Sequence, residues 1–317
     1  MPNPITVIIN ATAGTGAACP GPPELTGKFR RAGLEVTVIQ AANGDELIET
    51  AQRAVAGGAG IVVAGGGDGT INAVASAVIG SGCALGVLPM GTLNHFAKDL
   101  GIPTDIDDAI AIIVGGHRRK VDVGEVNGQP FLNNSSLGLY PNIVRDRQHQ
   151  QQRLGRGKWL AFVSATVTAL RRYPFLDAHL NIDGRSQRLR TPFIFIGNNE
   201  YSMTGFTLGT RSDLTRGQLS LYVAQRTSRV GLLRLALRSL FGRLHQARDF
   251  TALLAREITV ETHHRRLPVA TDGEVRWMDA PLQYRIRCAA LTVLVPAVPE
   301  GTSDTTAEMA GHATVDL

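Results

Sequence analysis

The chain is poor in aromatic residues and contains no long apolar run. Aromatic residues make up 5% of its 317 positions, and no platform of alternating basic and aromatic residues for stacking bases is visible. No stretch reaches the roughly 18 apolar residues that a membrane-spanning helix needs. These absences argue against nucleic acid as a partner and against a helical membrane span.

Cysteine is scarce as well. The three cysteines, Cys19, Cys83 and Cys288, lie far apart, and no two of them have zinc-knuckle spacing. We therefore expect free thiols in a reducing compartment such as the cytoplasm. The first residues, MPNPITVIINATAG, lack the basic segment and apolar run of a signal peptide, which agrees with that expectation.

The composition is that of a globular protein with an excess of positive charge. Hydrophobic residues make up 44% of the chain, and 32 Lys and Arg against 27 Asp and Glu give a formal net charge of +5. The length accommodates one large domain or two ordinary ones, with a sizeable core. The charge favours anionic partners such as phosphates or lipid head groups, without choosing among them.

Strand and helix patterns alternate through the first 125 residues. Short apolar runs of β-branched residues are followed by segments with apolar residues at helical spacing. Buried strands that alternate with helices predict a doubly wound parallel sheet. The expected strands are 5–10, 34–40, 59–66 and 83–91, and the expected helices are 45–58, 70–80 and 106–116.

The pattern changes after residues 117–128. Short strands separated by turn residues follow, and they predict an antiparallel β-sandwich or barrel. Helices are expected at 159–173 and 230–244. The resulting division is a first domain at 1–127, a second at 128–298 and a polar tail at 299–317, disordered or returning to the first domain. The expected strands are 177–183, 191–198, 218–225, 256–263, 268–274, 282–288 and 291–296.

The most informative stretch is GGGDGT at residues 65–70, which lies between a buried strand and a helix. Glycines let backbone N–H groups approach a phosphate, and a helix N-terminus adds partial positive charge. Asp68 would repel a phosphate unless Mg²⁺ lies between them or the carboxylate polarises an acceptor hydroxyl. The stretch therefore predicts a site for nucleotide phosphates and a metal. An ordinary strand-to-helix turn capped by Asp68 has the same pattern.

Two further strand ends repeat this layout. GVLPMGTLNHFAKDLGIP at 86–103 places Thr92 and Asn94 after a buried strand, and INATAGTG at 9–16 places Asn10 after another. The carboxyl ends of parallel strands are where ligands bind in such sheets. Three polar, glycine-containing loops at one edge favour a nucleotide pocket.

GGGDGT followed by P-x-G-T-x-N-x-F-A resembles the diacylglycerol kinase catalytic family, specifically its soluble bacterial lipid-kinase branch, which includes sphingosine-kinase-like proteins. Further stretches, at 119–139, 153–159, 195–199 and 269–274, are similar to later motifs of the family and occur in the expected order. The resemblance implies an α/β nucleotide domain like that of NAD kinase and phosphofructokinase, joined to an antiparallel β-sandwich lipid domain. It also implies that the active site lies between them.

The resemblance also implies the roles of individual residues. Glu274 would be the base that takes the proton of a lipid hydroxyl, and Asp122 would join the acidic network of the active site. Asp68 would bind Mg²⁺ and is the competing candidate for the base, whereas Glu274 could instead be only a hairpin-turn residue. The residues expected to hold ATP and its metal are Asn10, Gly66, Gly67, Asp68, Gly69, Thr70, Thr92 and Asn94.

The sequence departs from the family pattern in three places. His95 stands where the family often has Asp, and the first loop carries Ala11 and Thr15 in place of Pro and Lys. Arg216 stands where the family has the Asp of an L-x-D-G turn that binds a structural magnesium ion. An arginine cannot ligate a metal, so we expect this second site to be missing, with the guanidinium supplying the positive charge.

The stretch at residues 229–248 is the expected membrane contact. Its leucines fall at helical spacing, Arg229, Arg234, Arg238 and Arg243 are interspersed among them, and no acid occurs before Asp249. Such basic amphipathic helices lie on anionic membranes, although a helix packed on the sandwich would have the same pattern. A homodimer is possible on this sequence, but nothing in it fixes the oligomeric state.

Two other functions are compatible with these motifs. NAD kinases also carry G-G-D-G-T, and the NNE at 198–200 resembles their Asn-Glu motif. A lipid-binding regulatory module that kept the fold and lost the chemistry is the second alternative, suggested by His95 and Arg216. The motifs do not identify the lipid either, since diacylglycerol, monoacylglycerol, a sphingoid base and phosphatidylglycerol all present a hydroxyl near an apolar tail.

Overall fold

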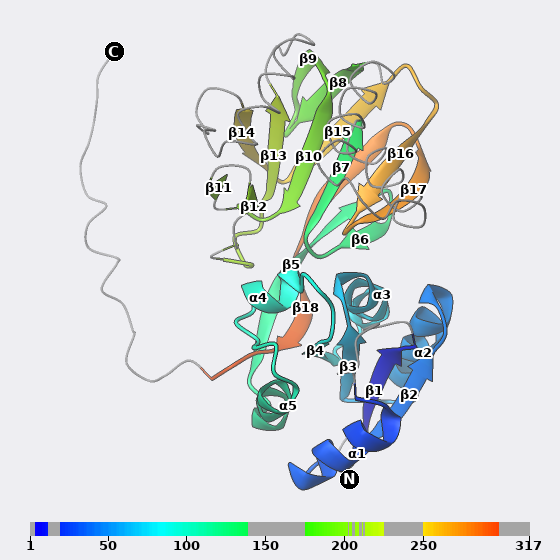
Figure 1. Ribbon diagram of the computed structural model, residues 1–317. Coiled ribbons are helices and arrows are strands. Elements are labelled where there is room, and N and C mark those ends of the chain that lie inside the picture. Colours follow the sequence, from blue (N-terminus) through cyan, green and yellow to red (C-terminus); the bar gives the residue numbers. More distant parts are fainter. Residues whose placement is uncertain are drawn as a thin grey trace, which may run out of the picture.

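The computed structural model describes residues 4–11, 20–138, 175–201, 203–204, 207–208, 211, 213–224 and 250–297. Within this part of the chain, two domains lie one above the other in Figure 1, with the blue-to-cyan first domain below the strands of the second. The expected helices at 159–173 and 230–244, the stretch at 229–248 and the tail from 299 lie outside the described residues.

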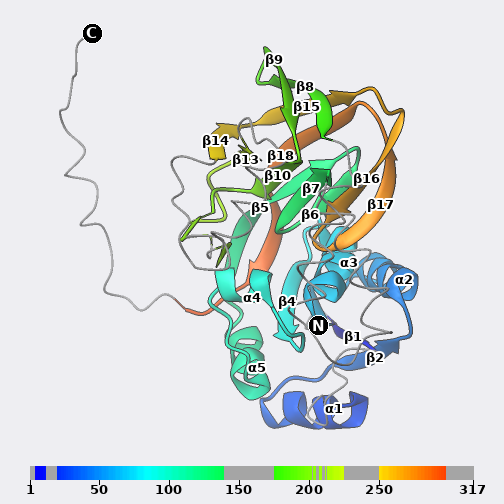
Figure 2. The same cartoon turned by 45° about the horizontal axis from the view of Figure 1, so that its top comes forward.

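The first domain is the doubly wound α/β sheet that the sequence predicts. Its strands are parallel in the order β2-β1-β3-β4. Helices α2 and α3 pack side by side on one face, and α1 and α5 lie together on the other (Figures 1 and 2). The strands are β1 (Ile5–Asn10), β2 (Thr37–Ala41), β3 (Ile61–Gly66) and β4 (Ala84–Pro89), and the helices are α1 (Pro22–Arg31), α2 (Gly44–Ala56), α3 (Asp68–Val78), α4 (His95–Asp99) and α5 (Ile106–Gly115).

Local sequence explains where these helices begin. The Asn43 side chain accepts a hydrogen bond from the Glu46 backbone N–H, and Glu46 accepts one from Ala42, which together cap α2. Helix α1 was not expected from the sequence, because only Leu25 and Phe29 are buried in it and the rest of its surface is polar. These two residues lie four apart and therefore share one face, and Pro22 is well suited to a first helical turn.

The second domain is an antiparallel sandwich, as predicted. One of its sheets has the order β14-β13-β10-β7-β16-β17, and the other continues from the first domain through β18 to β15, β8 and β9. Buried apolar side chains of both sheets form its core, with Phe131 edge-on to Tyr284. The strands are β5 (Arg118–Val126), β6 (Gln129–Phe131), β7 (Asn134–Gly138), β8 (Leu176–Ile182), β9 (Arg185–Thr191), β10 (Phe193–Asn198), β11 (Met203–Thr204), β12 (Thr207–Leu208), β13 (Leu219–Ala224), β14 (Phe250–Ala255), β15 (Glu257–Thr262), β16 (Arg266–Thr271), β17 (Glu274–Asp279) and β18 (Leu282–Leu294).

One strand belongs to both domains. The first half of β18 pairs with β15, and its second half pairs in parallel with β4, as Thr292 opposite Ala84 shows. The sequence pattern predicted that residues 291–296 belong to the sandwich, and this was wrong for Thr292 and Val293, which pair with β4. The pattern of a buried parallel strand and that of a sandwich strand are alike in so short a run, so only the pairing reveals the difference.

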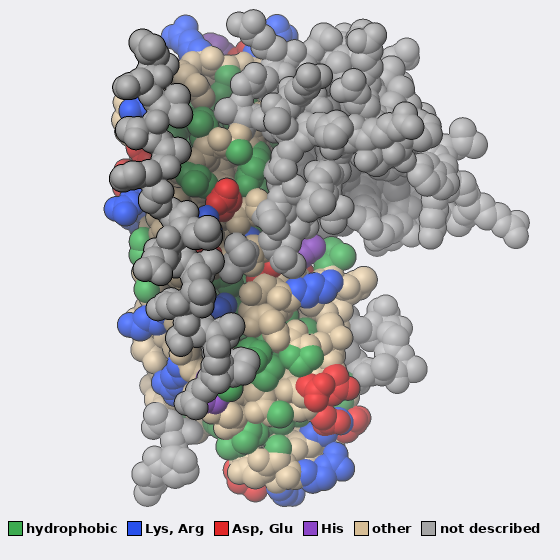
Figure 3. All heavy atoms as spheres, turned by 90° about the vertical axis from the view of Figure 1, so that its left-hand side faces the viewer, with side chains coloured by type: hydrophobic (Ala, Val, Ile, Leu, Met, Phe, Trp, Pro, Cys, Tyr) green, Lys and Arg blue, Asp and Glu red, His purple; other side chains and the backbone are tan. Residues whose placement is uncertain are grey.

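Two features of the described part concern membranes and anionic partners, namely the length of its helices and the distribution of charge on its surface. No described helix is long and apolar enough to cross a membrane. On the face shown in Figure 3, the described basic and acidic side chains are interspersed over the first domain. The described part of that face therefore offers no broad patch of one sign to an anionic partner.

Candidate nucleotide site and active site

A cavity of about 330 Å³ lies where β1, β3 and β4 end, and it contains residues of both domains. Five of the residues expected at the site line it, namely Asn10, Gly67, Gly69, Thr70 and Glu274. The cavity is also lined by Gly91, and by Gly44, Leu47, Ala73 and Met90, which were not singled out from the sequence. Gly91 lies within the P-x-G-T motif, whereas nothing in the sequence links the start of α2 to this site.

Glycines let the two loops of the cavity touch. A Cβ at Gly91 would collide with the Cα of Gly67 and would come within 2.8 Å of the Asn94 Oδ1. Gly67 is the N-cap of α3 and no side chain caps that helix, so its first N–H groups remain available at the cavity. Gly66 has another role, because a Cβ there would lie 2.5 Å from the Thr70 side chain. The glycines thus allow close packing of the loops and leave the start of α3 without a side-chain cap.

The second loop is shaped by Asn94, which is buried and has a left-handed backbone (φ 50°). Its side chain accepts a hydrogen bond from the Gly91 N–H at 3.0 Å and donates one to the Gly91 carbonyl at 2.9 Å. Neither Asn94 nor Thr92 lines the cavity, and Thr92 is exposed. Asn94 therefore stabilises the turn that lies beside Gly67.

Asp68 is the first residue of α3 and lies between the two loops. Its Oδ1 accepts a hydrogen bond from the Phe96 backbone N–H at 3.2 Å, which ties the glycine loop to α4. The described residues contain no group of three or more His, Cys, Asp or Glu side chains that could hold a metal. Mg²⁺ usually binds through one or two carboxylates together with substrate phosphates, so Asp68 fits a metal that arrives with a nucleotide.

Glu274 reaches the cavity from the second domain. It follows the two-residue turn between β16 and β17, in which Asp272 (φ 48°) and Gly273 (φ 87°) both have positive φ. Its Oε1 lies 3.5 Å from the position that a Cβ on Gly69 would take. Its Oε2 pairs with Arg276 at 3.2 Å. Glu274 is therefore both a hairpin residue and a carboxylate at the glycine loop.

Asp272 fixes this turn, and the sequence analysis gave it no role. Its carboxylate accepts hydrogen bonds from the backbone N–H groups of Leu132, Asn133 and Asn134 at 2.7, 2.8 and 3.0 Å. Desolvation raises the pKa of Asp272 to about 6, although these three donors and Arg211 act to lower it. An Asp before Gly is so common in turns that its type alone does not reveal such a role.

Asp122 does not line the cavity. It is 2% exposed, and its two carboxylate oxygens accept hydrogen bonds from the backbone N–H groups of Gly217 at 2.7 Å and Ala289 at 2.8 Å. Ala289 lies in the irregular segment of β18 between its two pairings. The structure thus places Asp122 where the domains join, rather than beside Asp68 and Glu274.

Arg216 lies between two carboxylates, as a cation would. Its guanidinium pairs with Glu200 at 2.6 Å and with Asp213 at 3.6 Å. The Thr215 hydroxyl is the main cause of the lowered pKa of Asp213, with a smaller effect from Arg216. The donors present here do not fit a second metal ion, because the guanidinium already faces the carboxylates. His95 is exposed at the start of α4.

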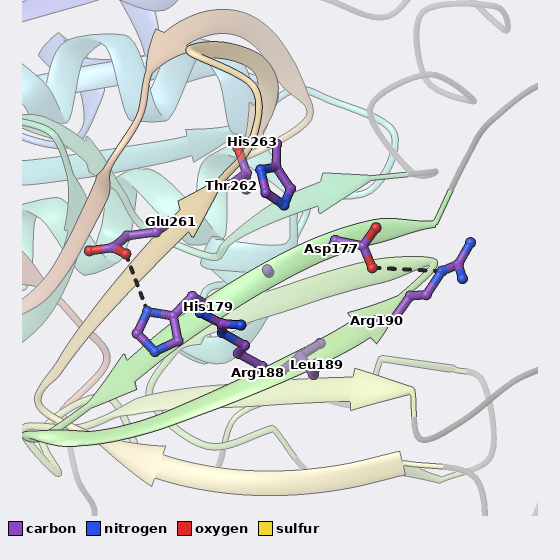
Figure 4. A pocket seen from close by; sticks show the side chains of 9 residues that line it. Asp177, His179, Arg188, Leu189, Arg190, Glu261, Thr262 and His263 are labelled. Carbon is purple, nitrogen blue, oxygen red and sulfur yellow. Dashed lines mark hydrogen bonds and ion pairs between the residues drawn. The ribbon is translucent and has the colours of Figure 1, made fainter.

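A larger cavity, of about 590 Å³, lies elsewhere in the second domain, on β8, β9 and β15. Its charged residues pair with one another, since His179 lies 3.2 Å from Glu261 and Arg190 lies 3.7 Å from Asp177 (Figure 4). No glycine-rich loop or helix N-terminus is among its described lining residues. The chemistry of phosphate binding therefore favours the smaller cavity.

Comparisons with known proteins agree with this arrangement of domains. The family model described as the diacylglycerol kinase catalytic domain matches residues 4–126, and that of the YegS C-terminal NAD kinase beta sandwich-like domain matches 142–295. The chain is 28% identical over 226 residues to the diacylglycerol kinases of Staphylococcus aureus strains JH9 and Newman, which is 70% of this chain and 70% of each relative.

Solved structures show the same fold. A diacylglycerol kinase from Bacillus anthracis str. Sterne superposes with a TM-score of 0.64 at 19% identity, covering 93% of this chain and 97% of that chain. Two further structures from the same organism, with the same coverage, give a TM-score of 0.69 at 21% and 22% identity. Sequence and structure comparisons thus agree on an α/β domain followed by an antiparallel β-sheet domain.

The contact between the loops predicts the effect of one methyl group. Gly91→Ala should lower the free energy of unfolding by about 1–3 kcal/mol, as overpacking typically does, and should weaken ATP binding. Gly27→Ala in α1 is the control, since its Cβ would meet nothing within 4 Å. That control should raise stability by about 0.5–1 kcal/mol. Equal stability of Gly91→Ala and wild type in urea unfolding would show that the loops do not touch.

Proposed function

We propose, from the match of residues 4–126 to the diacylglycerol kinase catalytic domain and of residues 142–295 to the YegS sandwich-like domain, that the chain transfers the γ-phosphoryl group of ATP to the hydroxyl of diacylglycerol or a related lipid at a membrane surface. These similarities support a phosphotransferase with an alcohol acceptor. The observation that carries the proposal is the approach of Glu274, from the second domain, to the glycine loop of the first. A cavity built from both domains can hold a nucleotide on one side and an acceptor on the other.

The first domain would bind and orient the nucleotide. The backbone N–H groups at Gly67 and Gly69 and the N-terminus of α3 face the cavity and suit phosphate oxygens. Asp68 and the phosphates would together hold Mg²⁺, which neutralises the charge of the transferred group. The Asn10 amide donates a hydrogen bond to the Thr70 hydroxyl at 3.4 Å and thereby helps to fix the loop floor.

The second domain would supply the base. The lipid hydroxyl oxygen forms a bond to the γ-phosphorus, the bond to the ADP oxygen breaks, and the hydroxyl proton passes to the Glu274 carboxylate. A carboxylate within hydrogen-bond reach of that hydroxyl can accept the proton. The Arg276 guanidinium, 3.2 Å from the Glu274 carboxylate, limits the orientation of that carboxylate.

Incubating the purified full chain with labelled ATP, Mg²⁺ and a panel of lipids and NAD tests the proposal. We expect label in a lipid carrying a free hydroxyl. Label in NAD would overturn the lipid assignment in favour of an NAD kinase. Lipid binding without transfer of label to any acceptor would favour a regulatory module.

Kinetic measurements should distinguish the role of Asp68 from that of Glu274. Asp68→Asn should weaken Mg·ATP binding, whereas Glu274→Gln should leave it intact and lower kcat by roughly 10²-fold, the low end of general-base effects because phosphoryl transfer has a loose transition state. Glu261→Gln, an exposed glutamate on β15, is the matched control and should keep wild-type turnover. Full activity of Glu274→Gln with a verified lipid substrate would remove it as the base.

Membrane association is proposed from the sequence of residues 229–248, which lie outside the described part. Arg234→Glu/Arg238→Glu should weaken binding to anionic vesicles, since each basic residue near a membrane contributes about 1 kcal/mol. The control is Arg30→Glu/Arg31→Glu, the same change in charge on the exposed surface of α1. Co-sedimentation at low salt that matches wild type would instead favour a helix packed on the sandwich.

A further inference from the structure

The proposed reaction needs Asp68 and Glu274 in register, although they belong to different domains. Phosphoryl transfer depends mainly on positioning, and an error of about 1 Å can cost roughly 10²-fold in rate. Glu274 is exposed and held by one ion pair to Arg276, which belongs to the same strand. Something beyond this pair must fix the β16–β17 turn relative to the first domain.

On the Glu274 side, the turn is anchored to the segment between β6 and β7. Asp272 accepts the three backbone hydrogen bonds of residues 132–134, and its own N–H donates to the Asn134 carbonyl at 2.9 Å. Three hydrogen bonds to the Asp272 carboxylate and one from its backbone N–H therefore fix the residue that lies two positions before Glu274. The position of Glu274 therefore follows that of residues 132–134.

On the Asp68 side, the anchor is α4. The Phe96 N–H near the start of this helix donates to Asp68, and Asp99 ends the helix. The Asp99 side chain is 4% exposed, so it needs a partner inside the protein. Any group that fixes Asp99 also fixes α4, the helix whose Phe96 N–H binds the Asp68 carboxylate.

Arg211 connects these two anchors. Its guanidinium is completely buried and pairs with Asp99 through Nε at 2.8 Å and Nη2 at 2.7 Å, while its backbone N–H donates to the other carboxylate oxygen at 3.0 Å. The same guanidinium donates to the Leu132 carbonyl at 2.6 Å and to the Asn133 Oδ1 at 2.8 Å.

Two more contacts complete the surroundings of Arg211. It donates to the Asn198 carbonyl at 3.0 Å and lies over the ring of Tyr201 at 5.3 Å, and the Tyr201 hydroxyl donates to the Asn133 carbonyl at 2.9 Å. Only the planar five-donor fork of arginine can satisfy partners in these directions, so lysine is not an equivalent.

We infer that Arg211 is a positioning residue that sets Glu274 against the glycine loop, through Asp99 and α4 on one side and through residues 132–134 and Asp272 on the other. The inference rests on the proposed function for its catalytic consequence. Asp68 begins α3, which packs on β3 and α2, and contacts between Gly67, Gly91 and Asn94 hold the nucleotide loops, so their places within the first domain do not depend on Arg211. Loss of Arg211 should therefore affect turnover more than nucleotide affinity.

The test variant is Arg211→Met/Asp99→Leu in the full chain. Replacing both partners avoids leaving an unpaired buried charge, which by itself destabilises a protein strongly. The control is Arg285→Met/Glu125→Leu, which removes another ion pair with a buried carboxylate, between β18 and β5. Both variants are measured in the wild-type and the Glu274→Gln backgrounds, together with Arg211→Lys.

We expect the test variant to lower kcat about 10- to 100-fold with the Kd for Mg·ATP little changed, while the control keeps wild-type kcat. In the Glu274→Gln background, the same test substitutions should have little further effect on kcat. The single variant Arg211→Lys should also have a lowered kcat, because lysine cannot replace the guanidinium. An equal loss of kcat in both backgrounds would mean that Arg211 does not act through Glu274 and would overturn the inference.

Backbone hydrogen exchange decides the inference independently of activity. The amides of residues 132–134 and of Phe96 should exchange faster in the test variant and should be unchanged in the control. Unchanged exchange at both places would overturn the inference, whatever the kinetics. If Glu274→Gln is fully active, the base assignment of the proposed function fails, and the exchange result still shows whether Arg211 holds the two anchors together.

Discussion

The sharing of β18 between two domains, within one continuous sheet, is the constraint on which the site depends. A single strand pairs with β15 and β5 of the second domain and then, past the irregular segment at Ala289, with β4 of the first. Its hydrogen bonds therefore fix the start of β4, at Ala84 and Leu85, relative to the sandwich. Asp122 strengthens this junction by binding the N–H groups of Gly217 and Ala289 from a buried position. Because the domains share a strand, a cavity between them is a fixed feature of the fold.

Features of the site that depend on local sequence pattern could be predicted from the sequence. Glycine-rich loops after buried strands have a distinctive composition, and Asn10, Gly67, Gly69 and Thr70 do line one cavity. What depends on distant partners could not be predicted. The Arg211–Asp99 pair joins residues 112 positions apart, and Asp272 meets its donors across about 140. Neither residue type is unusual at its position, so only the fold reveals these contacts.

The departures from the family pattern have a physical interpretation in this structure. Arg216 places a positive charge between Glu200 and Asp213, in the turn where the family pattern has a metal-binding Asp. The guanidinium is part of the chain and cannot leave the site as a metal ion can. This part of the second domain therefore does not need a cation from solution. Metal dependence would then reside only with the nucleotide and Asp68. Asn94, which the resemblance assigns to ATP binding, also shapes the loop that brings Gly91 against Gly67.

A crystal structure of the full chain with Mg²⁺ and a non-hydrolysable ATP analogue tests the central claim most directly. The account predicts phosphates against the backbone of Gly67, Gly69 and Gly91, with Mg²⁺ between them and Asp68 and with the Glu274 carboxylate facing the γ-phosphate from the second domain. A nucleotide bound in the cavity on β8, β9 and β15, or phosphates in the glycine loop with Glu274 turned away from them, would contradict it.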